Sequence, residues 1–363
     1  MSQRAFRRQV GQFVVTGFDG HVVPDDLRAL AREFDLGGVI LFARNVESPA
    51  QVAELSREVQ SLGRDWPLWV SVDQEGGRVA RLRAPFTEWP PMQALGRSGD
   101  AGLARRFATA LATELTAVGV TLDYAPVLDL DTNQRNSVIG DRALSDAPET
   151  VATLGVAIIE TLQACGIAAC GKHFPGHGDT TEDSHDELPV LDHAPDLLRA
   201  RELVPFKAAI GSDVAMIMTG HVQVTSLDAE RPATLSRAIV HDLLRGELGY
   251  RGLVATDDLD MRAIAGTYGI GEAVVRAVGA TVDLLLLCGP DAARQHEALE
   301  ALVHAAERGE LSMPELEASL GRHRRAKEHY LAEVRGWRPD ERVRDQVGRT
   351  EFLAVADEMA RHG

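Results

Sequence analysis

The apolar and polar positions of the chain follow two alternating patterns. Short runs of apolar or β-branched residues, typical of buried strands, are separated by longer stretches with the spacing of amphipathic helices. Eight short runs predict strands at residues 12–17, 38–43, 67–73, 120–127, 167–173, 213–219, 252–257 and 282–288. The stretches between them predict helices at residues 25–33, 49–62, 101–118, 148–164, 195–210, 235–248 and 271–279.

Eight alternations of strand and helix are typical of a closed (β/α)8 TIM barrel, an α/β fold. A doubly wound open sheet is the alternative. No linker, composition break or short internal repeat divides the chain, so we expect one domain over residues 1–334. Residues 335–363 are expected to form a C-terminal tail whose short helix packs on the barrel.

Composition narrows the possible partners. The 363 residues are 45% hydrophobic and 25% charged, as in ordinary globular proteins. A net charge of -16 disfavours binding to nucleic acid or to anionic membranes. Neither a secretory signal nor an apolar run of about eighteen residues is present, which predicts a cytoplasmic protein without a membrane span, and we expect a monomer. Cys165, Cys170 and Cys288 lie in apolar segments, so we expect buried free thiols.

Polar residues gather where the predicted strands end. Barrel enzymes carry out their chemistry at the carboxyl ends of the strands, so this clustering indicates a site there. A simpler interpretation is that strand ends are where any chain reaches the surface. The residues concerned are Asp73, Asp123, Lys172, His173, His221 and the acids of the stretch TDDLD, residues 256–260.

Three acids follow the seventh strand. Successive strand residues point to opposite faces, so only one of Asp257 and Asp258 can enter the barrel mouth, and alternation alone cannot choose between them. A carboxylate against an apolar wall can act as a nucleophile. The alternative role is a helix N-cap, for which Asp260 is better placed.

The stretch GKHFPGHGDTTEDSHDEL, residues 171–188, is rich in turn residues. Gly176 and Gly178 predict a loop that closes over the strand ends when a ligand binds, and His185 is expected to move with it. Asp183 lies two residues before His185, close enough to hold one ring nitrogen and favour the imidazolium. Such a dyad can donate and accept a proton near neutral pH.

The same stretch also contains metal-ligand side chains, namely His173, His177, His185, Asp179 and Asp183. Their spacing matches none of the compact zinc motifs, and Lys172 would place a cation beside the ion. We therefore expect no metal and no cofactor. A purely structural histidine cluster is a further alternative.

Four motifs, KHFPGHGDT...DSH, VSVDQEGGRVAR, NSVIGDR and ATDDLDM, occur in this order. Together they resemble the bacterial single-domain β-N-acetylglucosaminidases of glycoside hydrolase family 3 over about residues 10–290. The resemblance implies a (β/α)8 barrel, with Asp257 as nucleophile and His185 as acid/base paired with Asp183. Sugar-binding positions implied by the resemblance are Asp73, Arg81, Arg142, Lys172 and His173.

The expected function is that of a retaining exo-β-N-acetylglucosaminidase, or β-N-acetylhexosaminidase, with a covalent glycosyl-aspartate intermediate. The resemblance suggests muropeptides in peptidoglycan recycling as substrates. The chain departs from the pattern of this family at two places. Gly220 stands where alanine is expected, and the stretch RALSD, which begins at Arg142, differs from the usual continuation of the motif NSVIGDR. Phosphorolysis, a metal-dependent hydrolase and a non-catalytic sugar-binding protein remain alternatives.

Overall fold

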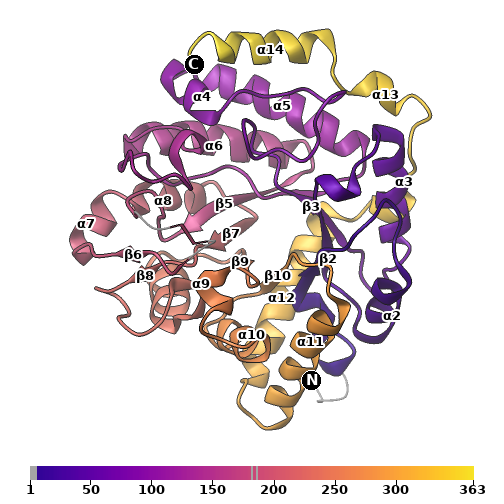
Figure 1. The fold of residues 1–363 in the computed structure, drawn as a ribbon, viewed down its shortest axis with the longest axis vertical. Helices are drawn as coiled ribbons and strands as arrows, with labels where there is room; N and C mark the ends of the chain where they lie inside the picture. The colour runs from indigo at the N-terminus through magenta and orange to yellow at the C-terminus, as the bar shows by residue number, and fades with distance from the viewer. Residues whose placement is uncertain (1–5, 181–182, 185–186) are drawn as a thin grey trace.

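The computed structural model describes residues 6–180, 183–184 and 187–363. Eight parallel strands form a closed barrel in the ring order β1-β10-β9-β7-β5-β4-β3-β2 (Figure 1). All eight predicted strands and the predicted (β/α)8 fold are therefore confirmed. The barrel strands are β1 (Val14–Thr16), β2 (Gly38–Leu41), β3 (Trp69–Val72), β4 (Leu122–Asp123), β5 (Ala168–Phe174), β7 (Met216–Thr219), β9 (Leu253–Asp258) and β10 (Leu284–Leu287).

Helices surround the barrel and continue beyond its last strand (Figure 1). One of them, η5, is wound as a π-helix where the sequence predicts an ordinary helix. The helices are α2 (Asp25–Phe34), α3 (Pro49–Gln60), α4 (Met92–Ser98), α5 (Ala101–Ala117), α6 (Pro148–Ala164), α7 (Pro195–Ala200), α8 (Leu203–Gly211), η5 (Ala238–Glu247), α9 (Arg262–Ala265), α10 (Ile270–Gly279), α11 (Ala292–Glu307), α12 (Met313–Tyr330), α13 (Val343–Gln346) and α14 (Thr350–Ala360).

The single helix predicted over residues 195–210 is wrong, because the chain breaks between α7 and α8. Pro205 lies in the first turn of α8 and cannot continue a helix that starts before Arg201, since its ring would clash with the carbonyl four residues earlier. The break releases Arg201 and Glu202 for side-chain contacts described below.

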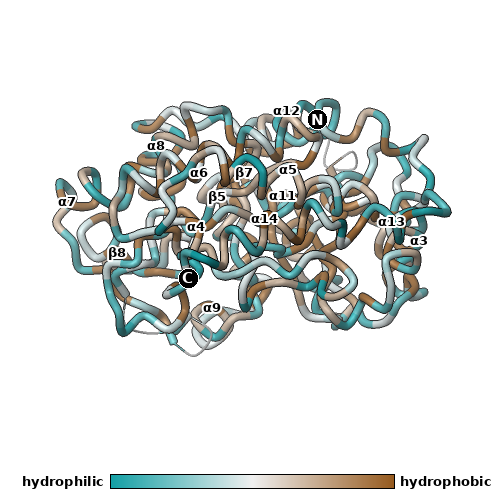
Figure 2. Tube along the Cα trace, turned by 90° about the horizontal axis from the view of Figure 1, so that it is seen from above, coloured by the Kyte–Doolittle hydropathy of each residue, from teal (hydrophilic) through white to brown (hydrophobic). Residues whose placement is uncertain are grey.

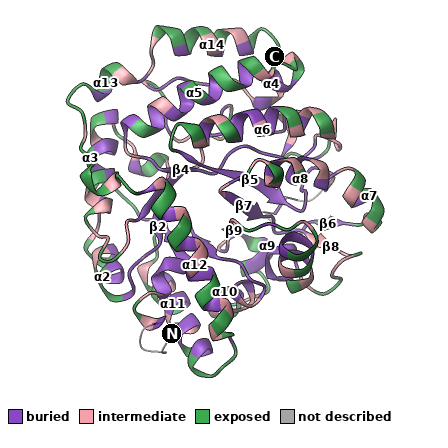
Figure 3. Ribbon diagram, turned by 180° about the vertical axis from the view of Figure 1, so that it is seen from behind, coloured by how far each residue is buried: buried purple, intermediate pink, exposed green. Residues whose placement is uncertain are grey.

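Side chains of the strands alternate between two apolar layers. One set fills the barrel and includes Leu253 and Ala255 of β9, whereas the intervening Val254 belongs to the layer between strands and helices. In Figure 2 the most apolar segments run through the interior of the trace, and in Figure 3 the strands are buried while the helices expose one face. This alternation decides which strand residues reach the barrel mouth.

Helix α12 packs across the amino ends of the strands. His323 Nε2 lies 2.9 Å from the carbonyl oxygen of Asp283, just before β10. Lys327 Nζ donates to the carbonyl oxygen of Gly37, just before β2, at 2.9 Å. The ring of Tyr330 lies 6.2 Å from that of Trp69, the first residue of β3. Because α12 covers these amino ends, the polar residues at the carboxyl ends of the strands are the candidates for a site.

The C-terminal segment follows α12 along the outside of the barrel, and α14 lies against α4 and α5 (Figure 1). The buried carboxylate of Glu114 on α5 accepts the N–H of Gly348 at 2.7 Å and the hydroxyl of Thr87 at 2.8 Å. A short parallel pair, β6 (Val190–Leu191) with β8 (Gln223–Val224), was not predicted. Within the described ranges, no helix is both long and apolar enough to span a bilayer.

The cysteines correct one prediction. Cys170 and Cys288 are buried free thiols, as expected, but Cys165 is exposed. Cys165 follows the last residue of α6, where the chain turns through Gly166 at a φ of 84°, so its side chain lies outside the apolar face of the helix.

Candidate active site

Five charged side chains form an ion-pair cluster at the carboxyl ends of β3 and β5. Lys172 Nζ lies 2.8 Å from Asp73 Oδ1 and 2.6 Å from Glu75 Oε1. Arg142 donates two parallel hydrogen bonds to Glu75, at 2.8 and 2.9 Å. Arg81 lies 3.3 Å from the second oxygen of Asp73. Four predicted sugar-binding residues are therefore brought together, with Glu75 at the centre.

Burial and ion pairing shift the pKa values of this cluster in opposite directions, and ion pairing has the larger effect. Burial alone would raise the pKa of Glu75, but Arg142 and Lys172 hold it far below its usual range. Burial alone would lower the pKa of Lys172, but Asp73 and Glu75 raise it. Both groups are therefore charged at neutral pH. Asp123 lies behind them, and burial raises the pKa of its carboxyl well above the usual range.

His173, the fifth predicted sugar-binding residue, is held by a buried carboxylate. Its Nδ1 lies 2.6 Å from Asp129 Oδ2, and Asp129 also accepts the backbone N–H groups of His173 and His177. Because a carboxylate only accepts, Nδ1 carries the proton and the ring orientation is set. Burial lowers the pKa of His177 to about 4, so that imidazole is neutral.

The loop after β5 starts as a tightly packed segment. A Cβ at Gly178 would lie 1.7 Å from the carbonyl oxygen of Leu130. Gly176 has a φ of 127° and packs on the side chain of Glu202. Asn136 Nδ2 donates to the carbonyl oxygen of His177 at 2.7 Å. The two glycines permit close packing here, so they give no support to a hinge.

The predicted dyad is described only in part. Asp183 is half-buried, and its carbonyl oxygen accepts the N–H of Glu187 at 2.9 Å. Ser184 is buried, and its hydroxyl lies 3.2 Å from His177 Nε2. His185 lies outside the described residues, so its pairing with Asp183 and its expected movement stay predictions.

The acids of β9 are separated by their surroundings. Leu253 and Ala255 point into the barrel, but the register with β10 shifts between Ala255 and Asp258, so alternation does not extend to the two acids. Asp257 feels the charges of His173, His221 and Lys172, whereas the Asp258 carboxylate accepts backbone N–H groups, so Asp257 is the acid that faces the polar residues of the mouth. Asp257 Oδ1 accepts the N–H of Asp258 at 2.8 Å. Burial alone would raise the pKa of Asp257, but the charges of His173 and His221 and this hydrogen bond lower it. The carboxylate is therefore ionised at neutral pH.

The other two acids bind neighbouring groups. Asp258 Oδ1 accepts the N–H groups of Cys288 and Asp260, each at 3.1 Å, and burial raises its pKa to about 6. Asp260 pairs with Arg294 instead of capping a helix. The predicted N-cap role of Asp260 is therefore wrong, because α9 begins after Met261 without a side-chain cap.

Two groups of metal-ligand side chains occur in the described part of the chain: Glu33, His296 and Glu300 on the outer surface, and Asp179, His193 and Glu202 beside the β5 loop. In the second group, Arg201 places a guanidinium nitrogen 2.7 Å from Asp179 and 2.6 Å from His193. That side chain supplies positive charge between the ligand-type atoms. His173 and His177, considered as ligands from sequence, bind Asp129 and Thr180 instead.

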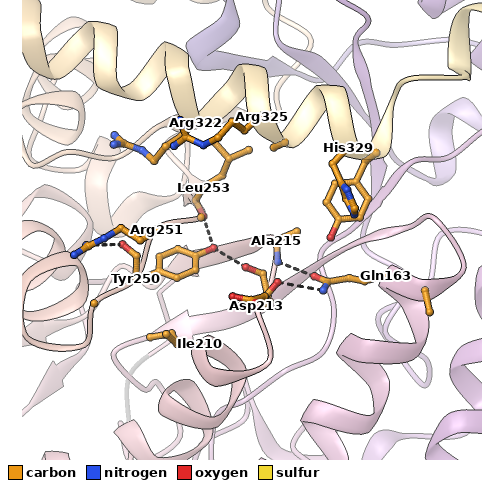
Figure 4. A pocket seen from close by; sticks show the side chains of 16 residues that line it. Gln163, Ile210, Asp213, Ala215, Tyr250, Arg251, Leu253, Arg322, Arg325 and His329 are labelled. Atoms are coloured by element: carbon orange, nitrogen blue, oxygen red, sulfur yellow. Dashed lines mark hydrogen bonds between the residues drawn. The ribbon is translucent and has the colours of Figure 1, made fainter.

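A groove of about 760 Å³ lies at the opposite end of the barrel, beside the amino ends of β7 and β9 (Figure 4). The hydroxyl of Tyr250 binds the carbonyl oxygens of Val214 and Leu253, and Gln163 binds the backbone of Asp213 and Ala215. These polar groups join structural elements, and the groove is remote from Asp257.

Three residues with prominent roles in this geometry were not assigned one from sequence. Glu75 lies two residues after Asp73 in the motif DQEGG, and this spacing could have indicated that both carboxylates belong to the site. Asp129 lies in an irregular segment after β4, so no periodicity indicated its contact with His173. His221 was noted as polar, but its bond to the backbone of Asp258 joins two strands and cannot be derived from spacing.

A closed barrel with an ionised aspartate and a cluster of paired charges at its carboxyl end defines the class, a (β/α)8-barrel enzyme. Residues 6–326 match the family model described as glycosyl hydrolase family 3 N terminal domain. The chain therefore belongs to glycosyl hydrolase family 3, as the motifs suggested.

Named relatives agree with this assignment. The chain is 36% identical over 326 residues to β-hexosaminidase A of Pseudoalteromonas piscicida, covering 83% of this chain but about half (54%) of the relative. A β-N-acetylglucosaminidase from Paenibacillus sp. str. FPU-7 superimposes with a TM-score of 0.92 at 40% identity, over 98% of this chain and 68% of that one. NagZ from Neisseria gonorrhoeae, solved with N-trifluoroacetyl-D-glucosamine, has a TM-score of 0.79 at 30% identity. The match covers 96% of this chain and 97% of NagZ.

Proposed function

We propose that the protein is a retaining exo-β-N-acetylglucosaminidase that removes terminal β-linked N-acetylglucosamine through a covalent glycosyl-aspartate. The observation that carries this proposal is the ionised carboxylate of Asp257, which lies under the electrostatic influence of His173, His221 and Lys172 at the carboxyl end of the barrel. A retaining glycosidase needs such a nucleophile and a separate acid/base. The β-hexosaminidase and β-N-acetylglucosaminidase names of relatives support the sugar.

The first step is attack of Asp257 on the anomeric carbon. Its lowered pKa keeps the carboxylate free of a proton at neutral pH, which a nucleophile requires. Because Asp257 attacks directly, the acetamido group of the substrate does not need to act as the nucleophile.

The ion-pair cluster would hold the sugar during that attack. Asp73 can accept hydrogen bonds from sugar hydroxyls, whereas Arg142, Lys172 and His173 can donate to hydroxyls or to the acetamido oxygen. Each of these side chains is already held by a charged partner, so little conformational freedom is lost when the sugar binds.

The proton transfers are assigned to His185 with Asp183. As imidazolium, His185 would protonate the leaving oxygen, and as neutral imidazole it would then activate the water that releases N-acetylglucosamine. Muropeptides met in the cytoplasm during peptidoglycan recycling are the proposed substrates. Cytoplasmic location and the monomeric state remain predictions.

The assay that tests the function uses EDTA-treated protein and an aryl β-N-acetylglucosaminide, with and without phosphate. We expect free N-acetylglucosamine in both tubes, and the β-anomer as the first product by NMR, because two displacements retain configuration. Formation of the sugar 1-phosphate would instead identify a phosphorylase. An untreated sample is assayed beside them. Product in the untreated sample alone would indicate a metal-dependent hydrolase, and no product in any sample would favour a binding protein.

Gly220, the departure noted in the sequence, supports a separate prediction. A Cβ at this position would lie 3.1 Å from the Cβ of His173, tighter than ordinary contacts. His173 cannot yield freely because Asp129 holds both its ring and its backbone N–H. We therefore expect Gly220→Ala to lower kcat/KM for the aryl glycoside by about 10-fold. Steady-state kinetics checks this, with Gly211→Ala, a glycine whose Cβ would meet open space, as control.

A further inference from the structure

We infer that His221, to which the mechanism above assigns no step, is a positioning residue that fixes the main chain around Asp257 and so orients the nucleophile. The inference rests on the proposed function, because it concerns how the attacking carboxylate is held.

His221 joins the two strands just beyond the point where their ladder ends. β7 and β9 pair in parallel up to Thr219 and Thr256. Two residues later, His221 Nε2 lies 2.8 Å from the carbonyl oxygen of Asp258. Without this bond, the end of β9 that carries Asp257 would lack its cross-strand contact to β7 at this level.

The hydrogen bonds place a proton on Nε2 and fix the orientation of the ring. A backbone carbonyl only accepts, so Nε2 of His221 carries a proton. Its Nδ1 lies 2.8 Å from Thr234 Oγ1, and that hydroxyl also lies 3.0 Å from Thr219 Oγ1 and from the carbonyl oxygen of Gly220. His221, Thr219 and Thr234 are each fully buried. The imidazole is therefore held at both nitrogens.

The contact acts on Asp257 through the next residue. The N–H of Asp258 donates to Asp257 Oδ1 at 2.8 Å, and the carbonyl of the same Asp258 is the group that His221 binds. The Asp258 carbonyl also accepts the N–H of Met261 at 3.1 Å, but that donor lies on the same segment, so His221 is the contact that ties this carbonyl to β7. Loss of the His221 bond would let Asp258 shift relative to β7, which would move the N–H that orients the Asp257 carboxylate. The reacting atoms would then be misplaced while the sugar-binding cluster stayed intact.

The deciding measurement is the rate at which a 5-fluoro-N-acetylglucosaminyl fluoride labels Asp257, followed by mass spectrometry. Fluoride departs with little help from an acid, so this rate reports on the nucleophile. We expect His221→Leu to label about 30-fold or more slowly, because small misplacements of reacting groups have large effects on rate. The inhibition constant of the product N-acetylglucosamine should stay within about 3-fold of the wild-type value, because the ring nitrogens of His221 bind Thr234 and Asp258, neither of which is a sugar-binding residue.

The matched control is His323→Leu. His323 is also fully buried, and its Nε2 lies 2.9 Å from the carbonyl oxygen of an aspartate, Asp283, but at the amino end of the barrel. The His323→Leu variant should have a lowered melting temperature, as His221→Leu does, but its Asp257 should be labelled at the wild-type rate. Labelling of His221→Leu within about 3-fold of the control would overturn the inference.

Two further variants separate the hydrogen bond from packing. His221→Gln retains a donor that can reach the carbonyl of Asp258, so it should recover part of the labelling rate, and no recovery would contradict the positioning role. If His221→Leu does not fold, Thr234→Val removes the Nδ1 partner and is expected to label more slowly than wild type; an unchanged rate would again contradict it. Wild-type protein that neither labels at Asp257 nor hydrolyses the aryl glycoside would refute the proposed function itself.

Discussion

Asp257→Asn is expected to lower kcat for an aryl β-N-acetylglucosaminide by on the order of 10⁴-fold, because the carboxamide cannot form the glycosyl ester. The side chain keeps its size and its place inside the barrel mouth, so the variant should fold. Binding of N-acetylglucosamine, measured by calorimetry, should change little, since Asp73, Lys172 and Arg142 are untouched. Steady-state kinetics and denaturant unfolding would check both expectations.

Asp258→Asn is the matched control for that variant. The two acids are neighbours and both are partly buried, but the Asp258 carboxylate is occupied by the N–H groups of Cys288 and Asp260. We expect this variant to retain activity within about 10-fold of wild type, because a carboxamide oxygen can still accept one of these bonds. Loss of activity in Asp258→Asn but not in Asp257→Asn would reverse the assignment of the nucleophile.

The barrel could be predicted from sequence because its signals are local. Each strand is a short apolar run that ends at a polar or turn residue, and each helix has its own amphipathic spacing. The break between α7 and α8 was missed although Pro205 was visible, because the apolar pattern continues across it. The π-wound helix η5 has no comparable local signal.

Most residues of the site could be predicted from the sequence, but their arrangement in space could be predicted only in part. Alternation along β9 cannot separate Asp257 from Asp258, and the irregular register with β10 before Asp258 has no signal in the sequence. The two acids differ in their contacts, because Asp258 binds the backbone N–H groups of Cys288 and Asp260. The contacts of Asp129 and His221 join segments that are 44 and 37 residues apart, and no spacing rule reaches across such distances. The packing of Gly178 on Leu130 likewise has no signal in the local sequence pattern.

Glu75→Gln should produce the largest combined effect on stability and substrate binding. Glu75 is buried and pairs with both Lys172 and Arg142, so its neutralisation leaves two buried cations with less negative charge. Removing one partner of a buried ion pair destabilises a fold by about 3 kcal/mol. Because Lys172 and Arg142 would also lose their fixed orientation, we expect KM for the aryl glycoside to rise by about 10-fold or more, with a smaller change in kcat.

The pH dependence of the stability lost in Glu75→Gln follows from the sign of the pKa shift of Glu75. The pKa of Glu75 is lowered in the folded protein, so its stabilisation is fully present above the ordinary pKa of about 4.3 and falls by about 1.4 kcal/mol per pH unit below it. The difference in unfolding free energy between wild type and Glu75→Gln, measured with urea, should therefore shrink between pH 5 and about pH 3. A difference that stayed constant over this range would show that Glu75 acts by packing and not by charge.

Asp283→Asn separates the effect on binding from the effect on stability. Asp283 is also a fully buried carboxylate, and it pairs with Arg245 at 2.6 Å and Arg322 at 2.8 Å, but it lies at the amino end of β10. Its pKa is lowered by the same kind of pairing despite burial, so the acid dependence of stability should match that of Glu75→Gln. Because Asp283 is remote from Asp257, KM should not change in this control. An equal rise of KM in both variants would mean that Glu75 affects the sugar site only through general destabilisation of the barrel.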